Sequence, residues 1–142
     1  MTRQELKIVS GGQTGVDQGA LTAALDLGLV WGGWVPKGWR AENGTVPEQF
    51  RARMQEHASA NYIVRTRQNV ADSHATLILT DAYPLSGGTL RTRDFCMNSF
   101  FPSFEETLRC RIGSKKIQYA CTWQIGTVPQ TAGGADTHVF LV

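Results

Sequence analysis

The 142-residue sequence lacks the features of membrane and nucleic-acid-binding proteins. No apolar run approaches the ~18 residues of a membrane span, and the start of the chain, MTRQELKIVS, has no charged segment followed by a long apolar stretch. The net charge is only +2, and no Lys/Arg run alternates with aromatic residues. We therefore expect a cytoplasmic protein with neither membranes nor nucleic acids as partners.

Cysteine and histidine are scarce. The three cysteines, Cys96, Cys110 and Cys121, have no CxxC spacing and no nearby His, so neither a disulfide framework nor a zinc site is predicted. The three histidines are scattered, and no GxSxG elbow or cysteine nucleophile motif is present. We therefore predict no metal site and assign no catalytic residue.

What the sequence does contain fits one α/β domain over residues 1–142, with 42% hydrophobic and 18% charged residues. Residues 6–10 are short and apolar and lead into Gly11 and Gly12, which predicts a buried parallel strand that ends abruptly. The next apolar side chains recur three and four positions apart, as on one face of a helix: Val16, Ala20, Leu21, Ala24 and Leu25. Gly28 is placed to end this helix.

Further along the chain, the pattern predicts a strand over residues 29–35, a long surface loop in PKGWRAENGTVPEQF and a helix over residues 60–72. Residues 75–79, ATLIL, form an apolar run of strand length, and a second glycine turn follows at residues 86–89. Beyond Thr92 no clean period is found, apart from an alternation over residues 117–125 that is typical of a half-exposed strand.

The glycine turns favour anion binding. A strand that ends in glycines and feeds a helix presents backbone N–H groups at the positive end of the helix dipole. The sequence Gly11-Gly12-Gln13-Thr14-Gly15 is neither the dinucleotide fingerprint nor the Lys-containing phosphate loop of ATPases. Asp17 has two open interpretations, a favourable dipole interaction or acceptance of a ligand hydroxyl or amine.

The second turn strengthens this hypothesis, because ligands in open parallel sheets lie beyond the carboxyl ends of the strands, where neighbouring loops converge. We expect both turns to face one ligand. Basic residues on the intervening segments are available to balance a phosphate: Lys37, Arg40, Arg65 and Arg67.

The predicted ligand-binding residues come from four segments. They are Ser10, Gly11, Gly12, Gln13, Thr14, Gly15 and Asp17; Lys37, Gly38 and Arg40; Thr66, Arg67 and Asn69; and Ser86, Gly87, Gly88 and Thr89. We also expect Gly12→Asp to abolish binding and leave the fold largely intact, since it would place a carboxylate where an anion approaches.

Four segments carry a resemblance to a known family: GGQTGVDQGAL, GGWVPKGWRAENG, RTRQNVADSHATLIL and SGGT. Together they resemble the circularly permuted YpsA-like branch of the Rossmann-like superfamily, whose members are named molybdenum carriers. The superfamily also contains DprA, the LOG phosphoribohydrolases and the molybdenum cofactor carrier proteins. The resemblance covers about residues 5–92. It implies a Rossmann-like three-layer α/β sandwich with a mostly parallel sheet, a phosphorylated pterin or nucleotide-like ligand such as molybdenum cofactor, and a homo-oligomer, either a dimer or a tetramer.

The chain departs from this superfamily in two places. The LOG relatives have a PGGxGTxxE motif, whereas here Gly87-Gly88-Thr89 is followed by Leu90-Arg91-Thr92-Arg93-Asp94 without that Glu, so hydrolase activity is not carried over. The resemblance also implies a continued helix after Gly88, another βα unit and a closing helix, none of which is recognisable. We therefore interpret the C-terminal third, residues 93–142, as irregular or divergent, or as the product of a shifted reading frame.

Three functions remain open. The first is a non-enzymatic carrier of a phosphorylated heterocycle, with molybdenum cofactor as the family's example. The second is an enzyme of nucleotide or nucleoside-phosphate metabolism, in which Asp17, Glu42 and Asp72 would be the first carboxylates to test. The third is a sensor of a nucleotide-derived signal, whose assembly changes on binding.

Overall fold

The computed structural model describes residues 6–80, 84–98, 103–112, 115–124 and 137–142, with side chains for 6–80, 84–98 and 139–142. The elements of the first half are β1 (Leu6–Val9), α1 (Val16–Asp26), β2 (Val30–Gly32), β3 (Trp34–Val35), β4 (Arg40–Ala41), β5 (Gly44–Thr45), α2 (Glu48–Arg51) and β6 (Gln55–Glu56). Those of the second half are α3 (Tyr62–Ala71), β7 (Ala75–Thr80), α4 (Gly87–Met97), β8 (Ser103–Ile112), β9 (Lys115–Gln124) and β10 (Thr137–Leu141).

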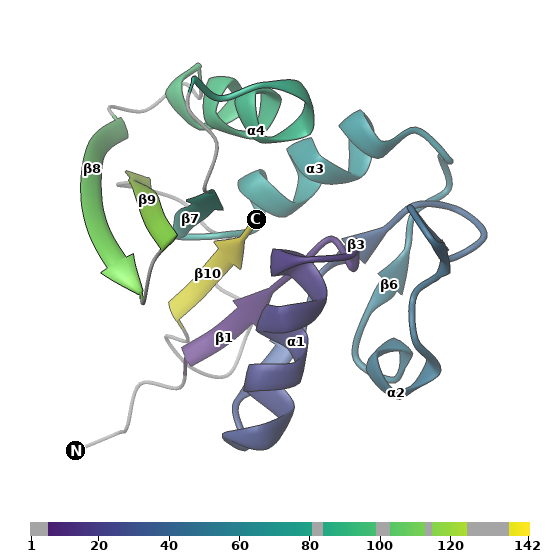
Figure 1. Cartoon of the computed structure of the whole chain (residues 1–142). Helices are drawn as coiled ribbons and strands as arrows, with labels where there is room; N and C mark the ends of the chain where they lie inside the picture. Colours follow the sequence, from purple (N-terminus) through teal and green to yellow (C-terminus); the bar gives the residue numbers. More distant parts are fainter. Residues whose placement is uncertain (1–5, 81–83, 99–102, 113–114, 125–136) are drawn as a thin grey trace.

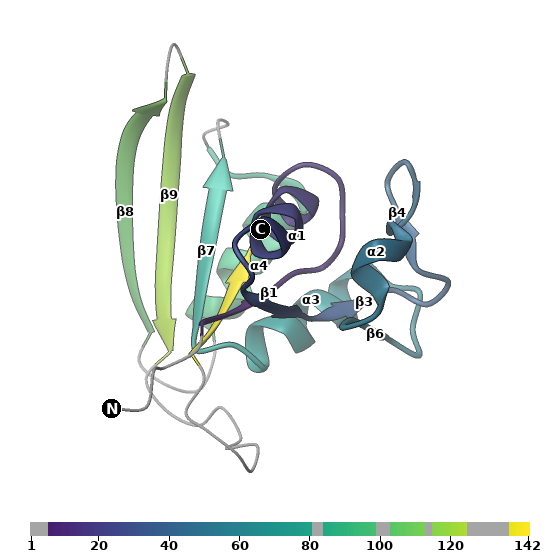
Figure 2. The ribbon, with the colours of Figure 1, turned by 90° about the horizontal axis from the view of Figure 1, so that it is seen from below.

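The main sheet of the described residues has the strand order β2-β1-β10-β7-β9-β8. Its first four strands run parallel, whereas β9 pairs antiparallel with both β7 and β8. Figure 2 shows these antiparallel strands at one edge and the short strands β3, β4 and β6 beyond the other. Strands β3 and β6 form a small parallel pair, and β4 and β5 form a hairpin.

Helices cover both faces of the parallel strands, with α1 on one side and α3 and α4 on the other (Figure 1). On the α3 and α4 side, side chains from strands and helices form one apolar cluster of Val9, Val70, Cys96 and Phe140. A second cluster joins α1 to the segment that runs from β3 through α2 to the start of β6, and contains Leu21, Val35, Ala41, Val46, Phe50 and Met54. This arrangement is a Rossmann-like three-layer sandwich, as the family resemblance implies.

Most of the predicted elements are confirmed. Leu21 and Ala24 of α1 are buried against the core, and Gly28 follows the helix with a φ of 65°, as expected for a glycine that ends a helix. The predicted strand over residues 29–35 is divided at Gly33, whose φ is 125°. A Cβ at Gly33 would lie 2.2 Å from the carbonyl oxygen of Ser10, so only glycine lets the two backbones approach this closely.

Two predictions need correction. The segment predicted as a loop, residues 36–50, contains the β4–β5 hairpin and the start of α2. The helix after Gly88, which is not recognisable in the sequence, is present as α4. The alternating stretch near residue 120 is the strand β9, and the last strand, β10, returns to the centre of the sheet between β1 and β7.

None of the helices in the described ranges is both long and apolar enough to span a bilayer.

Candidate functional site

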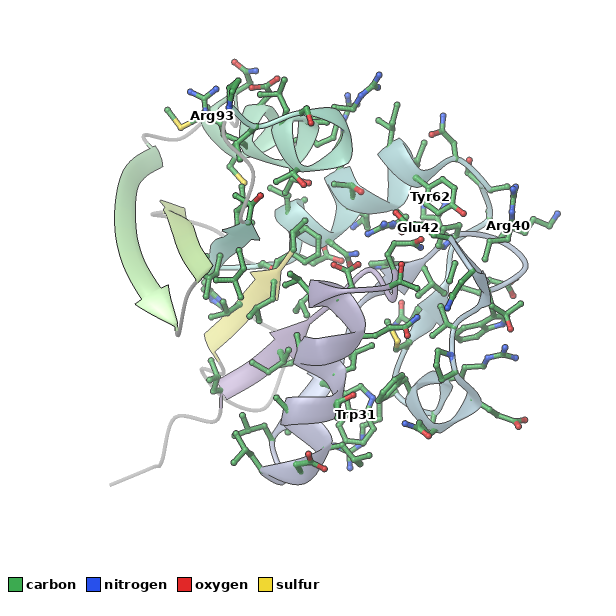
Figure 3. The ribbon with its side chains drawn as sticks, in the orientation of Figure 1. Trp31, Arg40, Glu42, Tyr62 and Arg93 are labelled. Carbon is green, nitrogen blue, oxygen red and sulfur yellow. The ribbon has the colours of Figure 1, made fainter. Side chains whose placement is uncertain are left out.

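A cavity of about 430 Å³ lies where the carboxyl ends of β7 and β10 meet the turn after β1. Its wall takes residues from the N-terminal parts of α1 and α3 and from most of the length of α4. These are Gln13, Thr14, Val16 and Asp17 before and in α1; Tyr62, Ile63, Arg65 and Thr66 in α3; and Gly88, Thr89, Arg91, Thr92 and Phe95 in α4. Glu42 from the β4–β5 hairpin, Leu79 and Val142 complete the lining. Figure 3 shows Glu42 next to Tyr62, with Arg40 further out and Arg93 on the far side of α4.

The turn after β1 is held by its own side chains. The Ser10 hydroxyl donates to the backbone carbonyl of Asp17 (3.1 Å) and accepts from the N–H of Gly12 (3.1 Å). The N–H of Gln13 donates to Oδ2 of Asp17 (3.1 Å). The N–H groups of Gly12 and Gln13 are therefore used within the turn, and those offered to a ligand belong to the start of α1, whose N-cap, Gly15, makes no side-chain cap hydrogen bond.

The absence of a side chain at Gly11 leaves room for a buried ion pair between Arg65 and Asp17. A Cβ at Gly11 would lie 1.5 Å from Nη1 of Arg65 and 2.9 Å from Oδ2 of Asp17. The Arg65 Nη1 atom lies 3.8 Å from Oδ2 of Asp17, and each side chain is only 7% exposed. The turn glycine thus lets the Arg65 guanidinium pass close to the main chain and reach the cavity.

Burial changes the protonation of this pair. Desolvation raises the pKa of the Asp17 carboxyl to about 6, against the opposing effects of Arg65 and of the hydrogen bond from Gln13. Desolvation also lowers the pKa of Arg65, which nonetheless stays charged. The cavity therefore contains a fixed cation beside a carboxyl group that titrates near neutral pH.

Two buried polar atoms of the cavity wall have no hydrogen-bond partner: Nε of Arg65 and Oε1 of Gln13. Buried polar groups are nearly always paired, so an orphaned donor and an orphaned acceptor on two residues that line one cavity suit a polar ligand. They fit a group that presents both an anion and a hydrogen-bond donor.

The second glycine turn also reaches the cavity, through Gly88, Thr89 and the first turns of α4. The α4 N-cap, Ser86, makes no side-chain cap hydrogen bond, unlike the α3 N-cap, Asn61, whose side chain accepts from the N–H of Ile63 (2.9 Å). Two of the three helix ends at the cavity therefore lack a side-chain cap.

The structure brings together six of the predicted binding residues in the cavity wall: Gln13, Thr14, Asp17, Thr66, Gly88 and Thr89. It places Ser10, Gly11, Gly12, Gly15, Ser86 and Gly87 in the turns behind or beside them.

The remaining predicted residues lie away from the cavity. Lys37 is exposed, and the N–H of Gly38 donates to the Glu56 carboxylate. Arg67 lies over the Phe95 ring at 5.0 Å and is exposed. Asn69 is fully buried and bonds the backbone N–H and carbonyl of Trp34 (2.7 and 3.0 Å), which joins α3 to β3.

Arg40 does not line the cavity, and only its backbone supports the wall, because its carbonyl accepts from Nε2 of Gln13 (3.1 Å). Its side chain is exposed.

The predicted list of binding residues left out several lining residues, of which Arg65, named from the sequence only among the basic residues that could balance a phosphate, is the most important. The spacing in the sequence does indicate Arg65, since Tyr62, Arg65 and Thr66 are three and four residues apart and so share a helix face. Arg67, which was chosen instead, lies on another face of α3.

The expectation that Gly12→Asp leaves the fold largely intact is wrong. A Cβ at Gly12 would lie 2.8 Å from Cγ2 of Val46 and 3.0 Å from Cγ1 of Val35, and the φ of Gly12 is 73°. A side chain here would disturb the apolar cluster and strain the backbone, so the variant would not leave the fold intact.

Metal ligands do not gather at this site. Among the residues that the structure describes, no three His, Cys, Asp or Glu side chains lie close enough together to hold a metal ion.

The Rossmann-like fold, with a polar cavity at the carboxyl ends of its strands, defines an α/β protein with a ligand-binding role. The chain belongs to the circularly permuted YpsA SLOG family, whose model matches residues 8–120. This match extends past Thr92 into β9.

A solved structure is also similar. It is the crystal structure of a protein named "Putative molybdenum carrier protein", from Syntrophus aciditrophicus SB, with 46% sequence identity and a TM-score of 0.61. The similarity covers 65% of this chain and 56% of that protein, so the chain spans little more than half of the neighbour's length. No curated protein matches the sequence.

Proposed function

We propose that the chain binds a phosphorylated heterocycle in this cavity, either molybdenum cofactor or a related nucleotide. One observation carries the proposal: two helix N-termini without side-chain caps and the orphaned Nε of Arg65 converge on one cavity. The name of the similar protein, a molybdenum carrier, supports the choice of molybdenum cofactor.

The phosphate would lie among hydrogen-bond donors. Backbone N–H groups at the start of α1 and α4 offer partial positive charge, and the Arg65 guanidinium offers a full charge with a planar fork. Asp17 and Glu42 oppose an anion, and Arg65 and Arg91 favour it. Because the pKa of Asp17 is about 6, uptake of one proton removes part of this opposition when a dianion binds.

The heterocycle would contact the less polar part of the wall. Tyr62 and Phe95 come from α3 and α4, and Ile63, Leu79 and Val142 add aliphatic surface. Flat rings bind well against aromatic and aliphatic side chains, and about 430 Å³ is within the range of ordinary small-molecule sites.

Calorimetric titration tests this proposal with molybdopterin-type cofactor, AMP, ADP-ribose and inorganic phosphate. At least one organic phosphate should bind more tightly than inorganic phosphate, and Arg65→Lys should weaken it by roughly tenfold or more, because the planar fork is lost. Arg67→Lys is the matched control on the same helix, and should change the affinity by less than roughly threefold. Equal effects of the two variants, or no binding of any of the four compounds, would contradict the proposal.

A second candidate, a nucleotide-processing enzyme, has one observation in its favour. The Asp17 carboxyl lines the cavity together with Glu42, and a pKa of about 6 suits a general acid or base. Under this alternative the protein turns over a nucleotide, and Asp17→Asn removes turnover while the nucleotide still binds. Absence of turnover with a panel of nucleotides that bind would exclude it.

A further inference from the structure

The Gln13 side chain is held in one orientation within the cavity wall. Gln13 is 8% exposed, and its backbone N–H donates to Oδ2 of Asp17 (3.1 Å). Its side-chain Nε2 donates to the backbone carbonyl of Arg40 (3.1 Å). Both ends of the residue are therefore fixed by the protein.

The contact with Arg40 determines which way the amide faces. Rotating the amide by half a turn would bring Oε1 against the Arg40 carbonyl oxygen, two acceptors without a proton between them. Nε2 therefore stays on the Arg40 carbonyl, and Oε1 remains on the other side, where it is buried and has no partner. A buried carbonyl oxygen without a donor is unfavourable, so a ligand group that donates to it would gain affinity.

The neighbouring groups from the same part of the wall are acceptors as well. Thr14 donates its hydroxyl to Oε2 of Glu42 (2.7 Å), so that hydroxyl is already used. Asp17 and Glu42 offer carboxylate oxygens, whereas the positively charged side chains of the cavity wall, Arg65 and Arg91, come from α3 and α4.

We propose that Gln13 determines specificity by accepting a hydrogen bond from an N–H or O–H group of the ligand, next to the phosphate. This inference rests on the proposed binding of a phosphorylated ligand. The donor comes either from a sugar hydroxyl or from the exocyclic amine of a purine-like or pterin-like ring. In both cases the ligand donates a hydrogen bond to Oε1 of Gln13.

Two pairs of nucleotides distinguish the sources. AMP and 2′,3′-dideoxy-AMP share a phosphate and a base but differ in two hydroxyl groups. GMP and IMP differ in a single exocyclic amine, the group that guanine shares with pterins. Inorganic pyrophosphate, an anion without a sugar or a ring, reports on the phosphate site alone.

The experiment measures dissociation constants of these five compounds with the wild-type chain, Gln13→Met and Gln18→Met. Gln18 is a matched control, because its Nε2 also donates to a backbone carbonyl, that of Gly12 (3.2 Å), and it does not line the cavity. Thermal denaturation of each variant shows that it is folded.

In the wild type, the donor-bearing member of at least one pair should bind roughly tenfold or more tightly than its partner, since the mismatched ligand leaves Oε1 unpaired. Gln13→Met should reduce this ratio to within roughly threefold of one, and Gln18→Met should keep it. Preference in the first pair identifies a sugar hydroxyl, and preference in the second identifies a ring amine.

The possible failures are distinct. If the wild type binds pyrophosphate but distinguishes neither pair, the role of Gln13 is overturned and the phosphate site stands. The role is also overturned if Gln13→Met keeps the preference. If the wild type binds none of the five compounds, this inference is overturned, and the proposed function fails as well if molybdopterin-type cofactor also does not bind.

Discussion

At the scale of single residues, the Asp17–Arg65 pair sets the electrostatics of the cavity. Its carboxyl group binds a proton more tightly in the folded chain than in the unfolded chain, because burial raises its pKa from 3.8 to about 6. The stabilisation that comes from the protonated Asp17 carboxyl is therefore fully present below pH ~4 and is lost as the pH rises through about 6. Above that pH, ionised Asp17 makes the fold less stable than a neutral group of the same shape would.

Asp17→Asn tests whether ionised Asp17 destabilises the fold. The amide keeps an oxygen for the Gln13 N–H and has no charge, so the difference in Tm between the variant and the wild type should grow between pH 4.5 and pH 7.5. This difference in Tm should increase by roughly 2–8 °C, because the ionisation of Asp17 costs about 1–2 kcal/mol of folding free energy over this pH range in a chain of this size. Asp26→Asn, at the exposed end of the same helix, is the control. A difference for Asp17→Asn that stays constant with pH would show that Asp17 is not destabilised by burial.

Gly11 and Gly12 are adjacent but have different neighbours, and alanine separates their roles. Gly11→Ala displaces Arg65 and should weaken pyrophosphate binding by roughly tenfold or more. Gly12→Ala pushes against Val35 and Val46 at a positive φ and should lower stability by about 2–4 kcal/mol. Titration and thermal denaturation of both variants check this. If Gly12→Ala proved as stable as the wild type, its packing role would be refuted.

At the scale of elements, the helix ends around the cavity differ in how they are capped. Asn61→Ala removes the one side-chain cap among them and should lower stability by about 1 kcal/mol. Ser86→Ala should change stability by less than about 0.5 kcal/mol, because Ser86 makes no cap hydrogen bond at α4. Chemical denaturation measures both, and equal losses would mean that Ser86 caps its helix and that this end is not left for a ligand.

Elements formed by neighbouring residues were predictable from the sequence. The turn at Gly11 and the helix α1 follow from local signals, namely an apolar run, glycines and a 3.6-residue period. The split at Gly33 depends on the approach of Ser10, more than twenty positions away in the chain, and no local pattern encodes it. Whether Arg65 or Arg67 lines the cavity likewise depends on how α3 packs against α4 and β3. The spacing of residues in the sequence indicates this packing only weakly.

At the scale of the whole molecule, the end of the chain belongs to the core. Strand β10 pairs with β1 and β7, and the fully buried Phe140 contacts side chains from β1, α3 and α4. Sequence patterns could not place this strand, because its partners lie more than 50 residues away in the chain and local patterns do not encode such distant pairing.

Phe140→Ala tests the place of β10 in the core. It should lower the free energy of unfolding by about 3–5 kcal/mol, since it leaves a cavity between sheet and helices. Met97→Ala, at a side chain that is 41% exposed, should cost less than about 1 kcal/mol. Comparable losses for the two variants in chemical denaturation would show that β10 does not lie at the centre of the sheet.

The central claim is that the cavity between the starts of α1, α3 and α4 holds a phosphate. The most direct measurement is a crystal structure of the protein with pyrophosphate. We expect a phosphoryl group within hydrogen-bond distance of the Arg65 guanidinium and of backbone N–H groups at the start of α1 or α4. Pyrophosphate bound elsewhere, with Arg65 still directed only at Asp17, would contradict it.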